Sequence, residues 1–194
     1  MPLSTARLLT LITTIVVLAG CAQNPQTLRL SVEPPEPNAS VSGGPPVALE
    51  VVDRREDKAL GVLQNREDED ATITTSQDLA YVVELAAGET LSQAGFPPQL
   101  WSDTATPRLL IEITELRHTV TADVPRRVDT RMTLQARAWR GGERFNGQAS
   151  TSRSARVVTR PGPERNAADI ARAVQDALRQ LFDRRLVDFL AGRG

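Results

Sequence analysis

The chain has 194 residues, a length that suits one folded domain. Its 23 lysines and arginines nearly balance its 24 aspartates and glutamates, which gives a formal net charge of −1 at pH 7. This balance argues against a nucleic-acid partner and against a polybasic membrane-binding patch, and the single cysteine rules out a disulfide within the chain.

Residues 1–20 have the organisation of a secretory signal peptide. A short start carrying Arg7 precedes an apolar run over residues 8–18, and small residues follow. A membrane-spanning helix needs about 20 apolar residues, more than this run supplies. The motif Leu18-Ala19-Gly20-Cys21 resembles the lipobox of bacterial lipoproteins. The resemblance implies cleavage between Gly20 and Cys21 and lipidation of Cys21; a plain cleaved signal with a free Cys21 thiol is the alternative.

Acylation of Cys21 would anchor the mature protein to a lipid bilayer. One acyl chain holds a protein only marginally, whereas two or more chains hold it stably. Ala22 follows the cysteine, in the place where an aspartate retains lipoproteins in the inner membrane. The resemblance to lipoproteins therefore implies the outer membrane, with the domain facing the periplasm. The inner membrane is the alternative.

Residues 21–46 are predicted to form a flexible, proline-rich tether. Six prolines lie in this segment, and proline lacks the backbone donor that a sheet interior or a helix requires. A fully extended tether would reach roughly 80 Å. Alternation over residues 27–32 would still allow a short strand to dock. The folded domain is then expected over residues 47–194.

The first half of this domain is predicted as short strands followed by a helix. Apolar runs and alternation indicate three strands, at residues 47–53, 60–63 and 71–74, with a polar turn at 64–70. The helix is expected to begin at a cap formed by Thr75 or Ser76, with Asp78 in its first turn. Gly95 is expected to end the helix.

The second half is predicted as a three-stranded meander followed by a second helix. The strands are expected at residues 108–120, 128–139 and 145–159, with a hairpin turn at 140–143 that contains two glycines. Asn166 and Asp169 have the spacing of a capping box at the start of the last helix. A wide apolar stripe then continues to Leu190, which is typical of packing on a sheet, with a partner-binding helix as the alternative.

These elements predict one α+β domain, in which two helices pack on one face of a largely antiparallel sheet.

Several short motifs also suggest a family. They are Asp53-Arg54-Arg55-Glu56-Asp57-Lys58-Ala59-Leu60-Gly61, Thr74-Thr75-Ser76-Gln77-Asp78-Leu79, Gly95-Phe96 and Asn166-Ala167-Ala168-Asp169-Ile170. With the lipobox, their order and spacing make the chain similar to the YajG-family lipoproteins. The resemblance implies a bacterial envelope protein with no assigned reaction.

Asp53 and Arg55 are the candidate site residues after the first strand. A carboxylate and a guanidinium two residues apart could clamp a polar ligand, or they could form a structural salt bridge within the loop. The acidic run at residues 67–70 could bind Ca²⁺, but it lacks the ligand spacing and the glycine of a calcium loop. A solvated turn explains this run better, and no metal site is predicted.

His118 is the only histidine, and no second histidine or spare cysteine is available to complete a zinc site. It is expected near a strand end, half exposed.

Trp101 and Trp139 could stack on a sugar, but burial in a small core explains them better. No serine lies in a nucleophile elbow, and the chain has neither a phosphate-binding loop nor a dinucleotide fingerprint. No cofactor is therefore predicted.

Two functions remain under comparison. The favoured one is a non-enzymatic binding or adaptor module in envelope maintenance or transport, with the bilayer and an envelope component as partners. The alternative is a periplasmic hydrolase whose carboxylate acid/base pair is hidden by long sequence separation.

Overall fold

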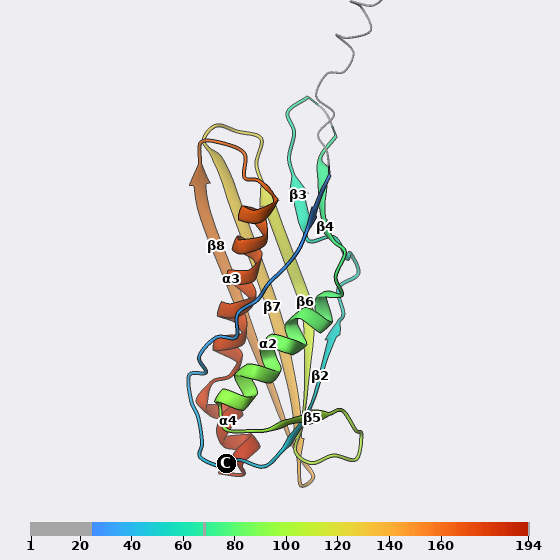
Figure 1. Ribbon diagram of the computed structural model, residues 1–194, viewed down its shortest axis with the longest axis vertical. Coiled ribbons are helices and arrows are strands. Elements are labelled where there is room, and N and C mark those ends of the chain that lie inside the picture. Colours follow the sequence, from blue (N-terminus) through green and yellow to red (C-terminus); the bar gives the residue numbers. More distant parts are fainter. Residues whose placement is uncertain (1–24, 68, 194) are drawn as a thin grey trace, which may run out of the picture.

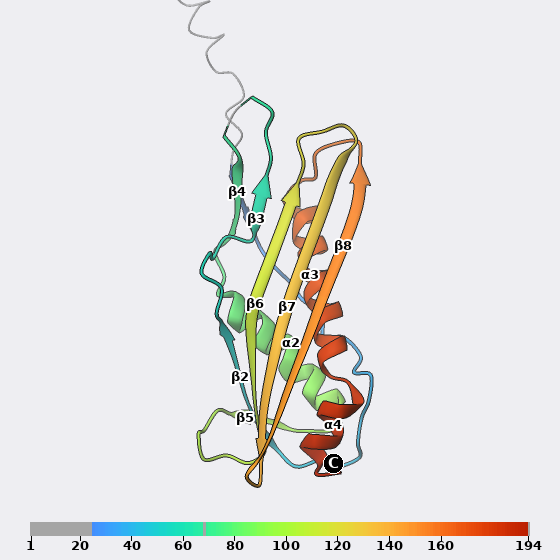
Figure 2. The ribbon, with the colours of Figure 1, turned by 180° about the vertical axis from the view of Figure 1, so that it is seen from behind.

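The computed structural model describes residues 25–67 and 69–193. The predicted signal peptide, the cleavage site at Gly20 and the lipidation site at Cys21 lie outside the described residues. One eight-stranded sheet forms the domain. Three helices of the described chain lie on one side of the sheet (Figure 1), and within residues 25–67 and 69–193 no helix covers the opposite side (Figure 2). This arrangement confirms an α+β domain with its helices on one face.

The strands and helices fill most of the described chain. The strands are β1 (Gln26–Leu28), β2 (Val47–Asp53), β3 (Gly61–Leu63), β4 (Ala71–Thr75), β5 (Pro98–Leu100), β6 (Arg108–Val120), β7 (Arg126–Arg140) and β8 (Glu143–Val157). The helices are α2 (Leu79–Gln93), α3 (Pro163–Leu181) and α4 (Arg184–Ala191). The predicted strands therefore form close to their expected positions; β1 overlaps the stretch at 27–32 that allowed a short docked strand, and β5 is added.

The sheet is mixed, so the prediction of a largely antiparallel sheet is corrected. Strands β6, β7 and β8 form the expected antiparallel meander, with Gly141 and Gly142 at positive φ in its hairpin turn. Strands β2 and β3, however, both run parallel to β6. The chain crosses over through β4 and α2 before it enters β6, and a crossover is what parallel pairing requires. An apolar run in the sequence does not encode this direction.

Strand β6 is the centre of the sheet. Strand β7 pairs along its whole length on one edge, so β2 and β3 share the other edge. Strand β2 pairs with residues 108–113 of β6, and β3 pairs with residues 118–120. Among the described residues, none pairs as a strand with the stretch between them on that edge, and β6 has a bulge there, between Ile113 and Glu115.

The helix boundaries differ from the sequence predictions. Asp78, rather than Thr75 or Ser76, caps α2, because its carboxylate accepts a hydrogen bond from the Ala80 backbone N–H at 2.9 Å. Helix α3 begins at Pro163, so the predicted capping box at Asn166 is wrong. The predicted single last helix is interrupted after Leu181, where Asp183 caps the separate helix α4.

The segment before β2 lies against the domain, which corrects the free tether for residues 26–46. Leu28 and Leu30 are buried, and β1 pairs with β4. The Val41 backbone N–H donates to the Ala94 carbonyl at 2.9 Å. Gly95 lies so close to this segment that a Cβ on it would meet the Val41 carbonyl oxygen at 1.9 Å. Proline prevents continuous strand pairing here, but the apolar residues between the prolines still dock.

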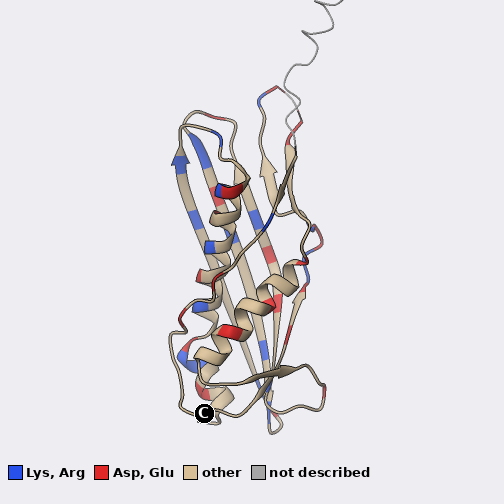
Figure 3. Cartoon of the chain, in the orientation of Figure 1, with Lys and Arg blue, Asp and Glu red and all other residues tan. Residues whose placement is uncertain are grey.

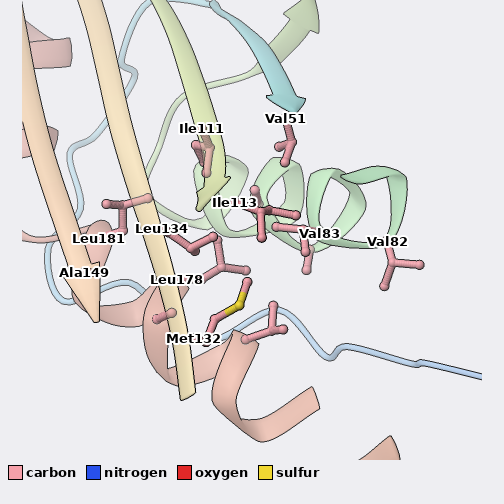
Figure 4. Close-up of a cluster of buried hydrophobic side chains, with 14 of the residues drawn as sticks. Val51, Val82, Val83, Ile111, Ile113, Met132, Leu134, Ala149, Leu178 and Leu181 are labelled. Carbon is pink, nitrogen blue, oxygen red and sulfur yellow. The ribbon is translucent and has the colours of Figure 1, made fainter. Parts of the chain in front are cut away.

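The core lies between the helices and the sheet. Alternate residues of β6 and β7 are buried, as their sequence pattern predicts. Figure 4 shows the centre of this cluster, to which β2, β6 and β7 contribute one layer and α2 and α3 the other. The labelled members include Val51, Ile111, Ile113, Met132, Leu134, Val83, Leu178 and Leu181.

Candidate functional site

The helix-free side of the sheet has a hollow where β2 ends and β3 begins. The hollow has a volume of about 700 Å³ and lies beside the bulge of β6. It forms because the loop between β2 and β3 leaves the middle of the β6 edge unpaired. Its charged lining residues are Arg54, Arg55, Glu56, Asp57, Glu115 and Arg117.

Arg55 lines this hollow, and it also meets Asp53, which lines a second hollow beside the start of α2. The Arg55 guanidinium donates through Nε to Asp53 Oδ1 at 3.0 Å and through Nη2 to Oδ2 at 2.9 Å. Its Nη1 donates to the Ala59 carbonyl at 2.8 Å. The side chains of Arg55 and Asp53 are only 5% and 14% exposed. These hydrogen bonds join the end of β2 to the loop that follows it, so the pair holds the loop in place.

Ion pairing keeps Asp53 charged. Burial alone would raise the pKa of its carboxyl group, but the hydrogen bonds from Arg55 outweigh that effect and hold the pKa below its usual value. Lys58 adds a positive charge, with Nζ 3.5 Å from Asp53 Oδ2. The Asp53 carboxylate is therefore suited to a structural role in the ionised state.

Glu112, on β6, is a second buried carboxylate near the hollow. Arg54 donates through Nε to Glu112 Oε1 at 3.2 Å, and Arg137 donates through Nε to Oε2 at 3.0 Å. Burial would raise the pKa of Glu112, but the hydrogen bonds from Arg137 and Arg54 outweigh it and lower the pKa. Glu112 therefore links two arginines on the helix-free side.

Most of the remaining arginines on this side belong to β6, β7 and β8. Along these strands they alternate with residues that face the core. We call the helix-free surface of the three strands the arginine face; Figure 3 shows arginine bands at several levels of these strands. Its seven arginines are Arg108, Arg117, Arg127, Arg131, Arg137, Arg144 and Arg156, and its three carboxylates are Glu112, Glu115 and Asp129.

Two pairs of arginines on this face lie directly opposite each other. Arg117 faces Arg131 across β6 and β7, and Arg127 faces Arg156 across β7 and β8. Like charges in directly opposed positions destabilise a sheet. The near-neutral net charge concealed this concentration of positive charge. The alternation of arginine along residues 127–137 is the sequence signal that could have revealed it.

Trp139 lies at the far end of the arginine face, between two arginines. Arg108 and Arg144 are its direct cross-strand neighbours, and their guanidinium carbons lie 4.7 and 5.8 Å from its ring centroid. The Trp101 ring meets Trp139 edge-on, with the centroids 6.1 Å apart. Both tryptophans are half-buried at the end of the sheet. The prediction that they fill the core is therefore wrong.

His118 is fully buried rather than half exposed. Its Nδ1 lies 2.8 Å from Thr130 Oγ1, and its Nε2 lies 3.1 Å from Asn166 Oδ1. Asn166 also donates to the Gln26 side chain at 2.7 Å. Burial lowers the pKa of His118, against the opposing effects of Asn166 and Asp169. This chain of contacts connects β6, β7, α3 and β1, and sequence spacing gave no sign of it.

The acidic run at 67–70 forms a turn in its described part. The Asp70 carboxylate accepts from the Asn65 backbone N–H at 3.1 Å, and the Asn65 side chain donates to the Glu69 carbonyl at 3.0 Å.

Among residues 25–67 and 69–193, no group of three or more histidine, cysteine or acidic side chains could hold a metal ion. Within the same ranges, none of the helices has the length and apolar character needed to cross a membrane.

Comparison with known proteins gave one family match. A family model described as an uncharacterized lipoprotein matches residues 33–191, which confirms the resemblance to YajG-family lipoproteins. The comparison with curated proteins gave no match.

Several solved structures have a similar fold. A Xanthomonas campestris protein of the DUF330 family is 15% identical, with 88% of this chain and 94% of that chain covered and a TM-score of 0.46. An uncharacterized protein is 10% identical, with coverages of 82% and 95% and a TM-score of 0.47. A PelC dodecamer from Paraburkholderia phytofirmans is 15% identical, with coverages of 77% and 94% and a TM-score of 0.40.

Proposed function

Because the chain belongs to the YajG family of uncharacterized lipoproteins, we propose that it is a non-enzymatic binding module anchored to the bacterial outer membrane by lipid on Cys21. The lipobox supports the anchor, and Ala22 in place of an aspartate supports the outer membrane. The domain faces the periplasm in this proposal. Its partners are the bilayer and a component of the envelope.

The anchor would hold one end of the domain close to the bilayer. Strand β1 begins at Gln26, and the five residues from Cys21 to this strand span at most about 18 Å. The docked segment over residues 26–46 leaves no long tether in the described chain. The proposal is therefore a module that works near the membrane surface.

The observation that carries the binding role is the uncovered arginine face. The opposite side of the sheet is buried under α2, α3 and α4, whereas β6, β7 and β8 present long, charged strands that no other part of the described chain covers (Figure 2). Arginine forms bidentate contacts with carboxylates and phosphates, and it is well suited to recognising anions. An anionic partner in the envelope is the function that this surface supports best.

The hydrolase alternative finds no support at the two buried carboxylates, Asp53 and Glu112. A general acid in glycoside cleavage needs a raised pKa so that it holds a proton near neutral pH. The pKa values of Asp53 and Glu112 are lowered, and both carboxylates are held by arginines. We therefore do not propose a reaction for these two residues.

Membrane fractionation with mass spectrometry tests the anchor. We expect the native protein in the outer-membrane fraction, without residues 1–20 and with acyl chains on Cys21. Cys21→Ser should lack the added lipid mass and leave the membrane pellet. Ala22→Asp, which keeps the cysteine, should move the protein to the inner membrane. A native protein that carries an unmodified Cys21 thiol would refute the anchor.

A further inference from the structure

We infer that the arginine face binds an extended acidic polysaccharide, a glycan polymer whose sugar units carry carboxylates. The inference rests on the proposed binding function and names the chemical class of its partner. Four features of the face support it: its charge, its shape, the residues between its arginines and the position of Trp139.

The charge of the face favours an anionic partner. Seven arginines share it with three carboxylates, although the whole chain has a net charge of −1. The opposed pairs Arg117 with Arg131 and Arg127 with Arg156 place like charges side by side. Arg127 also pairs with Asp129 at 2.7 Å and Arg131 with Glu115 at 3.8 Å, which offsets part of the repulsion. A carboxylate bound between two guanidinium groups would relieve this repulsion and gain charge-assisted hydrogen bonds.

The shape of the face favours a polymer. Strand β7 has 15 residues, which extend over about 50 Å, and it lies between β6 and β8. Arg127, Arg131 and Arg137 are distributed along it, with further arginines on both neighbouring strands. A small anion would contact one such group, whereas an extended chain of acidic units can contact several along the strand direction.

The residues between the arginines favour sugars over a protein surface. They are mostly hydroxyl and amide side chains, which both donate and accept hydrogen bonds. Of the outward-facing residues of β6, β7 and β8, only Leu110 and Trp139 are large and apolar. A protein partner normally buries an apolar centre in its interface. The hydroxyl and amide residues that are not buried are Thr119, Gln135, Asn146, Gln148, Ser150, Ser152 and Ser154.

Trp139 adds a platform for a sugar ring. An aromatic ring can pack against the C–H face of a pyranose, and Trp139 is half-buried with Arg108 and Arg144 on its two sides. A carboxylate on the same sugar would then lie within reach of a guanidinium. This combination distinguishes an acidic glycan from an acidic peptide.

The orientation of the face argues against a lipid surface as the occupant. Strands β6, β7 and β8 follow the long axis of the domain, and β1 lies toward one end of that axis (Figure 1). A bilayer held at that end by Cys21 would meet the loop ends of the strands. The length of the face would extend away from it.

Binding titrations on the full lipidated protein in neutral detergent test the inference. The acidic glycan probe is polygalacturonate, and the other probes are polyglutamate of equal charge, phosphatidylglycerol vesicles and uncharged dextran. The test variant is Arg117→Gln with Arg131→Gln. The matched control, Arg66→Gln with Arg184→Gln, removes two exposed arginines outside the arginine face. A second test variant is Trp139→Leu, which leaves the charge unchanged.

We expect polygalacturonate to bind at least tenfold more tightly than polyglutamate and dextran, with an affinity that falls as salt increases. The Arg117/Arg131 variant should lose at least tenfold in affinity, and the control less than twofold. Trp139→Leu should weaken polygalacturonate binding but not polyglutamate binding. The melting temperature of the Arg117/Arg131 variant should change little, because the substitution removes a like-charge pair together with the exposed ion pair between Arg131 and Glu115.

Each remaining outcome overturns the inference in a distinguishable way. Equal or tighter binding of polyglutamate or vesicles, lost in the Arg117/Arg131 variant, would refute the glycan while the proposed binding function stands. An equal loss in the control pair would show non-specific attraction between charges and refute the glycan. Binding of none of the probes would refute both the glycan and the arginine face as a binding surface.

Discussion

At the scale of single residues, the buried polar groups of this domain hold its segments together. His118 connects to Thr130 and Asn166, and Asn166 reaches Gln26 on β1. Asp53 and Arg55 perform the same task in the loop between β2 and β3. The His118 group joins distant parts of the sequence, whereas the Asp53–Arg55 pair holds one loop, so their loss should affect stability in specific ways.

His118 should make the free energy of unfolding depend on pH. Burial lowers its pKa in the folded protein, while the unfolded chain titrates near the ordinary value of 6.5. The unfolded state therefore binds more protons below about pH 6.5, and stability is lost as the pH falls. The lowered pKa values of Asp53 and Glu112 act in a separate window, below their ordinary values of 3.8 and 4.5.

Denaturant unfolding at about pH 7.5 and about pH 5.5 measures this effect. The native chain should lose stability as the pH falls over this interval. The His118→Gln variant should lose clearly less, because its glutamine side chain does not titrate. The variant should also be less stable at the higher pH by about 1–3 kcal/mol, because polar groups in the core lose partners. The same loss over the interval in both proteins would contradict the assignment to His118.

Removing one member of the Asp53–Arg55 pair should be costly. Asp53→Ala leaves a guanidinium that is only 5% exposed without its counter-charge, which costs about 3–5 kcal/mol for a buried pair. Lys58→Gln is the matched control, because Lys58 contacts the same carboxylate but is 60% exposed, and it should cost less than about 1 kcal/mol. If Asp53→Ala and Lys58→Gln lowered the free energy of unfolding equally in chemical denaturation, a structural role for the pair would be contradicted.

At the scale of elements, the sequence patterns located most strands but not their directions or partners. Alternation identified β6 and β7, and paired glycines identified the turn at 141–142. The parallel pairing of β2 and β3 on one edge of β6 depends on the crossover through α2, which no local pattern encodes. The prolines before β2 suggested a free tether, because local propensity does not report tertiary docking of Leu28 and Leu30.

Docking of the N-terminal segment predicts a stability effect at Leu30. This side chain is 3% exposed, and Leu→Ala in a core costs about 2–5 kcal/mol. Leu100→Ala is the matched control, because Leu100 is 94% exposed and should change the free energy of unfolding by less than about 0.5 kcal/mol. If residues 26–46 were a free tether, the two substitutions would have the same small effect in thermal or chemical unfolding.

At the scale of the whole molecule, the family could be predicted from short motifs, whereas the candidate site could not. The lipobox and the motifs near Asp53, Asp78, Gly95 and Asn166 sufficed for the family. The arginine face combines residues from three strands that are separated by turns, and the near-neutral net charge of the chain concealed it. Only the register of β6, β7 and β8 brings these arginines together.

The central claim is that the arginine face is the surface that meets the envelope partner. A photoreactive amino acid at Ser152, on the arginine face, and another at Ser92, exposed on α2, test it in intact cells. Both sites replace an exposed serine, so the local cost of the substitution is similar. We predict that irradiation gives a slower-migrating adduct from position 152 and none from position 92. Adducts from position 92 alone, or equal adducts from both positions, would contradict the claim.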